Sequence, residues 1–215
     1  MPRSLFALSA DLAASRRAPD RARLARTVAK ALRHLAAAWP EAWVAPPVTT
    51  RGLDEISGAL RRPEHAFDAL AALNAAVWPQ RFRAALAEGT VDVGARTHDA
   101  RAMDGPAFHR AADALLRAKR EDLPLVLAVD FLTPEEQRVL EQAMRLHGAV
   151  AAAWKPSRAA AAAALRAAGT QKAAARRLKI TPQSVSEALA AAHGTEIVAL
   201  EAAIREHLAA AYSRK

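Results

Sequence analysis

The chain has 215 residues, of which 52% are hydrophobic types, and its length allows one large domain or two small ones. It has no cysteine, which excludes a disulfide framework and a thiolate zinc site, and no apolar stretch reaches the roughly 18–20 residues of a membrane span. The formal net charge of +9 attracts phosphate backbones. The length, the absence of cysteine and the absence of a membrane span together predict a two-domain cytoplasmic protein with no membrane contact.

The first half of the chain predicts strands that alternate with helices. Residues 4–12 are apolar and predict a buried strand, and Asp20 is a suitable cap for a helix that carries Leu24, Val28, Leu32 and Leu35. Residues 42–50 predict a second strand, whose Pro46 and Pro47 require an edge or a bulge. The glycine turn at 52 is expected to open a short helix over 52–62, and a longer helix follows from Pro63 to Val77.

The pattern then continues into a helical second half. Residues 81–94 predict a strand, Asp104 and Pro106 start a helix, and 123–131 predict a buried strand. Thr133 and Pro134 open another helix, with acids in its first turn. These alternating elements predict an α+β fold, a ferredoxin-like or nucleotide-cyclase-like sandwich over residues 1–132. A connector helix over 133–156 and an all-α domain over 157–215 complete the predicted organisation.

The most informative segment is 171–189, QKAAARRLKITPQSVSEAL, which predicts a helix-turn-helix. Its first helix runs from Gln171 to Leu178 and its second from Pro182 to Ala191, with Thr181 as cap and a proline at the first position. Ala175 is small, as two helices that cross steeply require, and Leu178, Val185 and Leu189 are expected to face inward while Ile180 fills the corner. Lysine at 179 departs from the glycine that is common in this turn.

The polar residues of this segment predict contacts to duplex DNA. From Trp154 onward there are 10 Lys and Arg against 4 Glu, whereas the first 153 residues have 21 against 18. Polar side chains of the second helix suit base edges, and the cations suit phosphates. The predicted DNA-binding residues are Lys172, Arg176, Arg177, Lys179, Thr181, Gln183, Ser184, Ser186 and Glu187. Two alternatives stay open: a plain helical hairpin with a solvated basic face, and a helix-turn-helix that contacts protein.

The last predicted helix, Glu196 to Tyr212, has Ile197, Leu200, Ile204 and Leu208 at spacings of three and four. This stripe is expected either to close the three-helix core or to pair two protomers in a homodimer, and we favour closure of the core. Helix-turn-helix proteins commonly bind two half-sites as dimers, so a homodimer is expected as well. The N-terminal domain is then expected to sense a small-molecule or protein effector, to dimerise, or to dock a partner. A protein-interaction adaptor without a ligand stays an alternative function.

Three segments together resemble the SatD family of bacterial proteins: SADLAASRRAPDRARL at 9–24, TTRGLDEISGAL at 49–60 and DGPAFHRAADAL at 104–115. The resemblance implies a regulatory role in bacteria and a C-terminal helix-turn-helix, and implies little about chemistry. The chain departs from the family pattern at Ala10, Leu53 and Ser57. The positions that fall on the family motifs are Asp11, Ser15, Arg16, Asp20, Arg21, Asp54, Glu55, Asp104, Gly105, Pro106 and His109.

A weaker likeness links Asp11, Asp54 and Glu55 to the carboxylates that hold two metal ions in class III nucleotidyl cyclases and GGDEF proteins. Paired carboxylates suit Mg²⁺, so an Mg²⁺ or nucleotide site here is an alternative function. The opposing interpretation, which we prefer, has Asp11 capping a turn and the other two acids capping a helix. The expected glycine is missing and no basic partner for a transition state is identifiable, so we expect no cofactor and no catalytic residue. His109 is expected to be an interface or capping residue.

Overall fold

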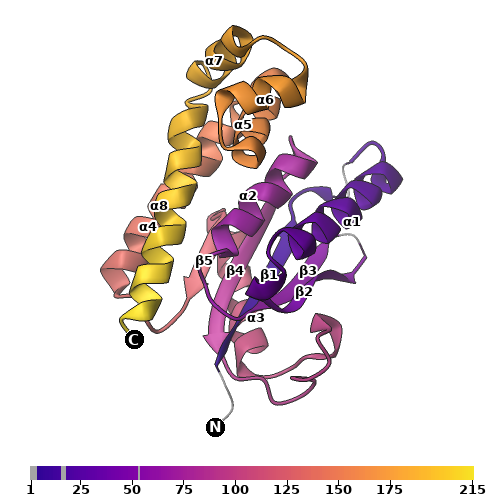
Figure 1. Ribbon diagram of the computed structural model, residues 1–215. Coiled ribbons are helices and arrows are strands. Elements are labelled where there is room, and N and C mark those ends of the chain that lie inside the picture. Colours follow the sequence, from indigo (N-terminus) through magenta and orange to yellow (C-terminus); the bar gives the residue numbers. More distant parts are fainter. Residues whose placement is uncertain (1–3, 16–17, 53) are drawn as a thin grey trace.

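The computed structural model describes residues 4–15, 18–52 and 54–215, and its N-terminal half is a mixed sheet with helices on both faces (Figure 1). Within these residues, five strands lie in the order β2-β3-β1-β4-β5. Neighbouring strands are antiparallel, except β4 and β5, which are parallel. The α+β class is therefore confirmed. The strands are β1 (Leu5–Leu12), β2 (Trp43–Arg51), β3 (Glu55–Leu60), β4 (Phe82–Gly89) and β5 (Leu125–Ala128).

Each face of the sheet is buried by its own helices, because alternate side chains of a strand point to opposite faces. Phe6 and Leu8 of β1 pack in the core under α1 and α2, whereas Leu5 and Ala7 pack against α3 on the other face. The N-terminal cap Asp20 and the apolar stripe of α1 are as the sequence predicts. The helices of this half are α1 (Arg21–Ala38), α2 (Ala66–Val77) and α3 (Pro106–Glu121), with short 3₁₀ turns at Pro40–Ala42 and Ala100–Ala102.

The prediction of a short helix over 52–62 is wrong, because this segment contains strand β3. Gly52 adopts φ +59°, and after this turn the chain runs back antiparallel to β2, with Arg51 opposite Glu55. Five of the six residues of β3 are buried, since helices cover both faces of the sheet. A strand buried on both faces has no polar and apolar alternation, so its sequence resembles a short helix.

The two prolines of β2 lie at the edge of the sheet, as their missing amide hydrogens require. The register between β2 and β3 shifts between Ala45 and Val48, on either side of Pro46 and Pro47. Gly58 of β3 lies under this irregularity, where an added Cβ would come within 3.1 Å of the Pro47 Cα. The glycine therefore lets the irregular edge strand approach its neighbour.

The C-terminal half is helical throughout. Thr133 and Glu136 form the reciprocal capping box at the start of α4, and the break before α5 falls at 153–155. Among the described residues, no helix combines the length and the apolar character that crossing a bilayer requires. These helices are α4 (Pro134–Ala152), α5 (Pro156–Ala168), α6 (Gln171–Leu178), α7 (Pro182–Ala190) and α8 (Gly194–Ser213).

Helix α8 returns to the N-terminal half, which corrects the role expected for its apolar stripe. Ile204 and Leu208 are buried in the core that includes α2 and β1, and Tyr212 packs edge-on against Phe6 at 5.1 Å between ring centroids. Only the first part of the helix, through Val198, touches the core of α5, α6 and α7. Since the stripe is used within the chain, it is not free to pair two protomers.

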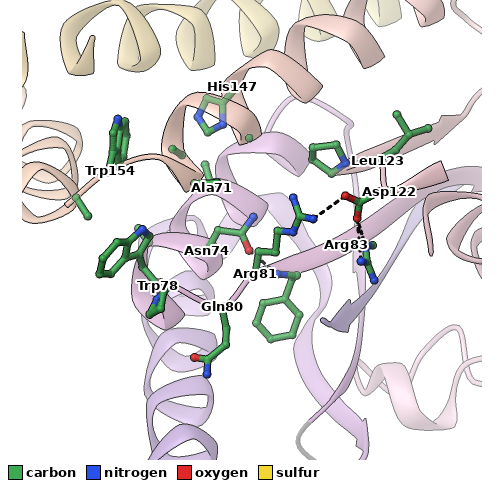
Figure 2. A pocket seen from close by; sticks show the side chains of 18 of the residues that line it. Ala71, Asn74, Trp78, Gln80, Arg81, Arg83, Asp122, Leu123, His147 and Trp154 are labelled. Atoms are coloured by element: carbon green, nitrogen blue, oxygen red, sulfur yellow. Dashed lines mark hydrogen bonds and ion pairs between the residues drawn. The ribbon is translucent and has the colours of Figure 1, made fainter. Parts of the chain in front are cut away.

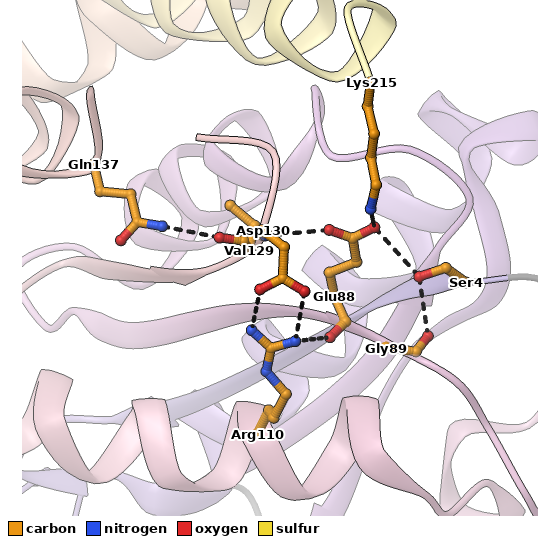
Figure 3. Close-up of polar contacts among 8 residues, drawn as sticks. All are labelled: Ser4, Glu88, Gly89, Arg110, Val129, Asp130, Gln137 and Lys215. Atoms are coloured by element: carbon orange, nitrogen blue, oxygen red, sulfur yellow. Dashed lines mark hydrogen bonds and ion pairs between the residues drawn. The ribbon is translucent and has the colours of Figure 1, made fainter. Parts of the chain in front are cut away.

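A polar network fixes the end of α8 to the sheet (Figure 3). The Glu88 carboxylate at the end of β4 is 2% exposed and accepts hydrogen bonds from Lys215 Nζ at 2.5 Å and from the Ser4 hydroxyl at 3.3 Å. Beside it, Arg110 of α3 binds both carboxylate oxygens of Asp130 and also donates to the Glu88 carbonyl. Burial of a carboxylate is tolerated here because it is paired and hydrogen-bonded.

Candidate nucleic-acid interface

Helices α6 and α7 are joined by a tight turn whose parts agree with the sequence pattern. The Thr181 hydroxyl accepts a hydrogen bond from the Ser184 N–H at 3.1 Å, and the Thr170 hydroxyl accepts from the Ala173 N–H at 3.2 Å. Lys179 takes the left-handed conformation, with φ +57°, that glycine usually adopts at this position. Both helices are therefore capped at their first turns, and the lysine fills the glycine position of the turn.

The core of this unit is built mainly from small residues. Ala175 is 2% exposed and lies with Val185 and Leu189 against the alanine-rich face of α5. This packing confirms the need for a small residue at 175. The prediction for Ile180 is wrong: its side chain is 47% exposed, because α5 already closes the corner and the chain reverses at Lys179. Leu178 is only half-buried.

The residues predicted to contact DNA all lie on the surface of this unit. Helices α6 and α7 stand at one end of the molecule, away from the sheet, and leave the outer side of α7 uncovered (Figure 1). The exposed members are Lys172, Arg176, Arg177, Lys179, Thr181, Gln183, Ser184, Ser186 and Glu187.

The cations of α6 are not neutralised within the described chain. Residues 155–192 contain seven Lys and Arg but a single acid, Glu187. Arg166 differs from the cations of α6, because its guanidinium is paired with the buried Glu201 carboxylate. Across residues 4–15, 18–52 and 54–215, the structure shows no carboxylate within 4.0 Å of the Lys172, Arg176, Arg177 or Lys179 nitrogens. Their full charge is therefore available to an anionic partner.

The polar side chains of α7 are oriented by contacts among themselves. The Gln183 amide donates to the Glu187 carboxylate at 3.1 Å, one helical turn away, and the Thr181 and Ser184 hydroxyls lie 2.8 Å apart. The exposed Ile180 lies immediately before this row. Sequence reasoning missed Ile180 as a surface residue, although an apolar group at such a position suits contact with a thymine methyl.

The carboxylates considered for Mg²⁺ lie together where β1 ends and β3 begins, but Lys119 lies among them. Asp11 of β1 lies opposite Glu55 of β3, and Asp54 precedes it. Lys119 of α3 binds the Asp11 carboxylate at 2.8 Å, an interaction that the sequence did not indicate. Among the described residues, no cluster of three or more His, Asp or Glu side chains has the arrangement to hold a metal ion. The prediction that Asp54 and Glu55 cap a helix is wrong, because strand β3 starts at Glu55.

The motif positions behind the SatD resemblance have local structural roles. The Asp20 carboxylate caps α1 by accepting from the Arg23 N–H at 2.8 Å. In the third motif, Asp104 accepts from the Gly105 N–H and binds the His109 ring at 2.9 Å, so the histidine helps to hold the entrance of α3. Ser15 is 5% exposed, and Arg16 lies outside the described residues.

In comparisons with known proteins, no family model and no curated protein matches the chain.

Proposed function

We propose that this chain binds duplex DNA through α6 and α7 and acts as a transcriptional regulator. The observation that carries the proposal is the exposed outer side of α7, with Gln183, Ser184 and Ser186, beside cations of α6 that have no carboxylate partner among the described residues. A second helix of this kind enters the major groove with its N-terminal residues at base edges, while cations beside it bind phosphates.

The charges divide the two roles between the helices. Arg176 and Arg177 lie in the last turn of α6, next to the turn, so they can bind phosphate oxygens on either side of the groove that α7 enters. Gln183 lies in the first turn of α7, where an amide can pair with adenine in the major groove. The protein would then bind all duplexes through α6 and prefer some sequences through α7.

Removal of two phosphate-binding cations is expected to weaken binding to every duplex. In the variant Arg176→Ala/Arg177→Ala, the slope of log K against log salt is expected to become shallower by about 2, since each phosphate contact contributes about 0.9. Fluorescence anisotropy with a random-sequence duplex at several salt concentrations measures this slope. The matched control is Arg120→Ala/Arg138→Ala, which removes the same charge from exposed positions of α3 and α4. Equal slopes for the two double variants would contradict the proposal.

Gln183→Ala is expected to act on sequence preference. Affinity for random duplex should stay within about twofold of wild type, whereas discrimination at one base pair of the preferred site should fall by about 1–3 kcal/mol. Selection of bound sequences from a randomised pool, followed by competition binding, measures both quantities. A selected site that is identical for the variant and the wild type would show that Gln183 does not contact a base.

We also propose that the sheet domain is a ferredoxin-like sandwich within the SatD family. Its support is the connection β1-α1-β2-β3-α2-β4, with the order β2-β3-β1-β4 and antiparallel neighbours, which is the split β-α-β arrangement. Strand β5 extends this sheet by pairing parallel to β4. Cytoplasmic location and a homodimer on two half-sites belong to the same proposal. An Mg²⁺ or nucleotide site at Asp11 has less support, because Lys119 already binds that carboxylate.

A further inference from the structure

A pocket lies where the sheet domain meets the first helix of the DNA-binding unit (Figure 2). We call it the junction pocket. One side is formed by the end of α2 and the start of β4, and the other by the end of α4 and by α5. Its principal side chains are Asn74, Trp78, Arg81, His147, Trp154 and Arg166.

The walls of the junction pocket are largely apolar. The rings of Trp78 and Trp154 lie on the same side of it in Figure 2, and alanines leave room between the helices, among them Ala71, Ala75 and Ala151. Binding sites for small organic molecules are typically apolar with a few polar groups. The apolar lining suits a hydrocarbon or aromatic group.

One polar feature shows what else the occupant must carry. Arg81 reaches to the Asp122 carboxylate at 2.6 Å, and Arg83 binds the other oxygen of the same carboxylate at 2.8 Å. Two guanidinium groups share one carboxylate, so this side of the pocket has an excess positive charge.

We propose that the junction pocket binds a small aromatic carboxylate. The ring lies against the apolar wall that the tryptophans and alanines line, and the carboxylate oxygens accept from the Arg81 guanidinium. Arg81 uses one Nη of its five N–H donors on Asp122 and keeps the others for the ligand. Because α5 forms one wall, the ligand contacts the sheet domain and the DNA-binding unit at once, as an effector would.

Isothermal titration calorimetry on the full chain without DNA tests this inference independently of DNA binding. The probes are 3-phenylpropionate and its uncharged amide, which differ in charge and have nearly the same shape. We expect a dissociation constant on the order of 0.1–1 mM for the carboxylate, with weaker binding of the amide. No saturable binding of the carboxylate, or tighter binding of the amide, would overturn the proposal.

Three variants then locate the ligand. Arg81→Gln should weaken binding of the carboxylate about tenfold and leave the amide unchanged, because a charge-assisted hydrogen bond is lost. Ala75→Phe should abolish binding of both probes by filling the space between the walls. Arg138→Gln, on the exposed side of α4, is the matched control and should bind as wild type does. If Arg81→Gln binds the carboxylate as tightly as wild type, the ligand lies elsewhere and the proposal fails.

Discussion

Replacing Glu201 of α8 by alanine is expected to lower the free energy of unfolding by about 3–5 kcal/mol. The carboxylate is 3% exposed and accepts hydrogen bonds from His147 of α4 at 2.7 Å and from two nitrogens of Arg166 of α5 at 2.5 and 2.6 Å. Without it, the Arg166 guanidinium keeps its charge in a site that is largely shielded from water. Urea unfolding followed by circular dichroism measures the change.

Two variants separate a lost pair from a general defect of α8. Glu196→Ala removes an exposed acid from the first turn of the same helix and should change stability by less than about 0.5 kcal/mol. The double variant Arg166→Met/Glu201→Leu removes both charges and should regain part of the loss, because apolar groups of similar volume replace the buried pair while His147 still lacks its acceptor. If the double variant is as unstable as Glu201→Ala, an unpaired charge is not the cause.

The contacts of Glu201 explain how the unit of α5, α6 and α7 is held on the rest of the chain. They join α8 to α4 and α5, and a second ion pair, from Arg205 to Asp68 at 3.1 Å, joins α8 to α2. Ion pairs with defined partners favour one arrangement of helices over others, which apolar contacts alone do less well. The orientation of α6 and α7 relative to the sheet therefore depends on these pairs and on the apolar core under α8.

Elements with strong local signals could be predicted from the sequence. Asp20 and Thr133 accept hydrogen bonds from residues three positions along the chain, so the starts of α1 and α4 are encoded within a few residues. The α6–α7 turn is local in the same way, and this is why its caps and its buried face could be placed. Strand β3 could not, because its burial on both faces comes from helices that are distant in sequence.

In the candidate site too, the features that depend on local sequence could be predicted, and the contacts between distant residues could not. The outward side chains of α7 follow from helical geometry once the buried Val185 and Leu189 are known. The partners of Arg166 and Asp11 could not be predicted: Glu201 is 35 residues from Arg166, and Lys119 comes to Asp11 from another element. For Arg166 the consequence is functional, because a cation counted toward the DNA-binding charge in fact stabilises the fold.

Acid is expected to destabilise the protein through Glu201 over a defined range of pH. Burial by itself would raise the pKa of Glu201, but the hydrogen bonds from Arg166 and His147 outweigh it and lower this pKa from 4.5 to about 2. A carboxyl whose pKa is lower in the folded state stabilises the fold above its unfolded pKa. That contribution, on the order of 3 kcal/mol, is lost as the pH falls from about 4.5 to about 2.

The measurement is the free energy of unfolding in urea between pH 7 and pH 2, for the wild type and for Glu201→Gln. The difference between the two should be constant above about pH 5 and should shrink below it. Glu141→Gln provides a control of opposite sign, because burial, only partly offset by Arg117, raises the pKa of Glu141. A raised pKa costs stability as the pH rises above 4.5, so the advantage of the wild type over this variant should shrink toward neutral pH. Parallel curves for the wild type and Glu201→Gln down to pH 2 would show that the carboxylate is not held ionised by its partners.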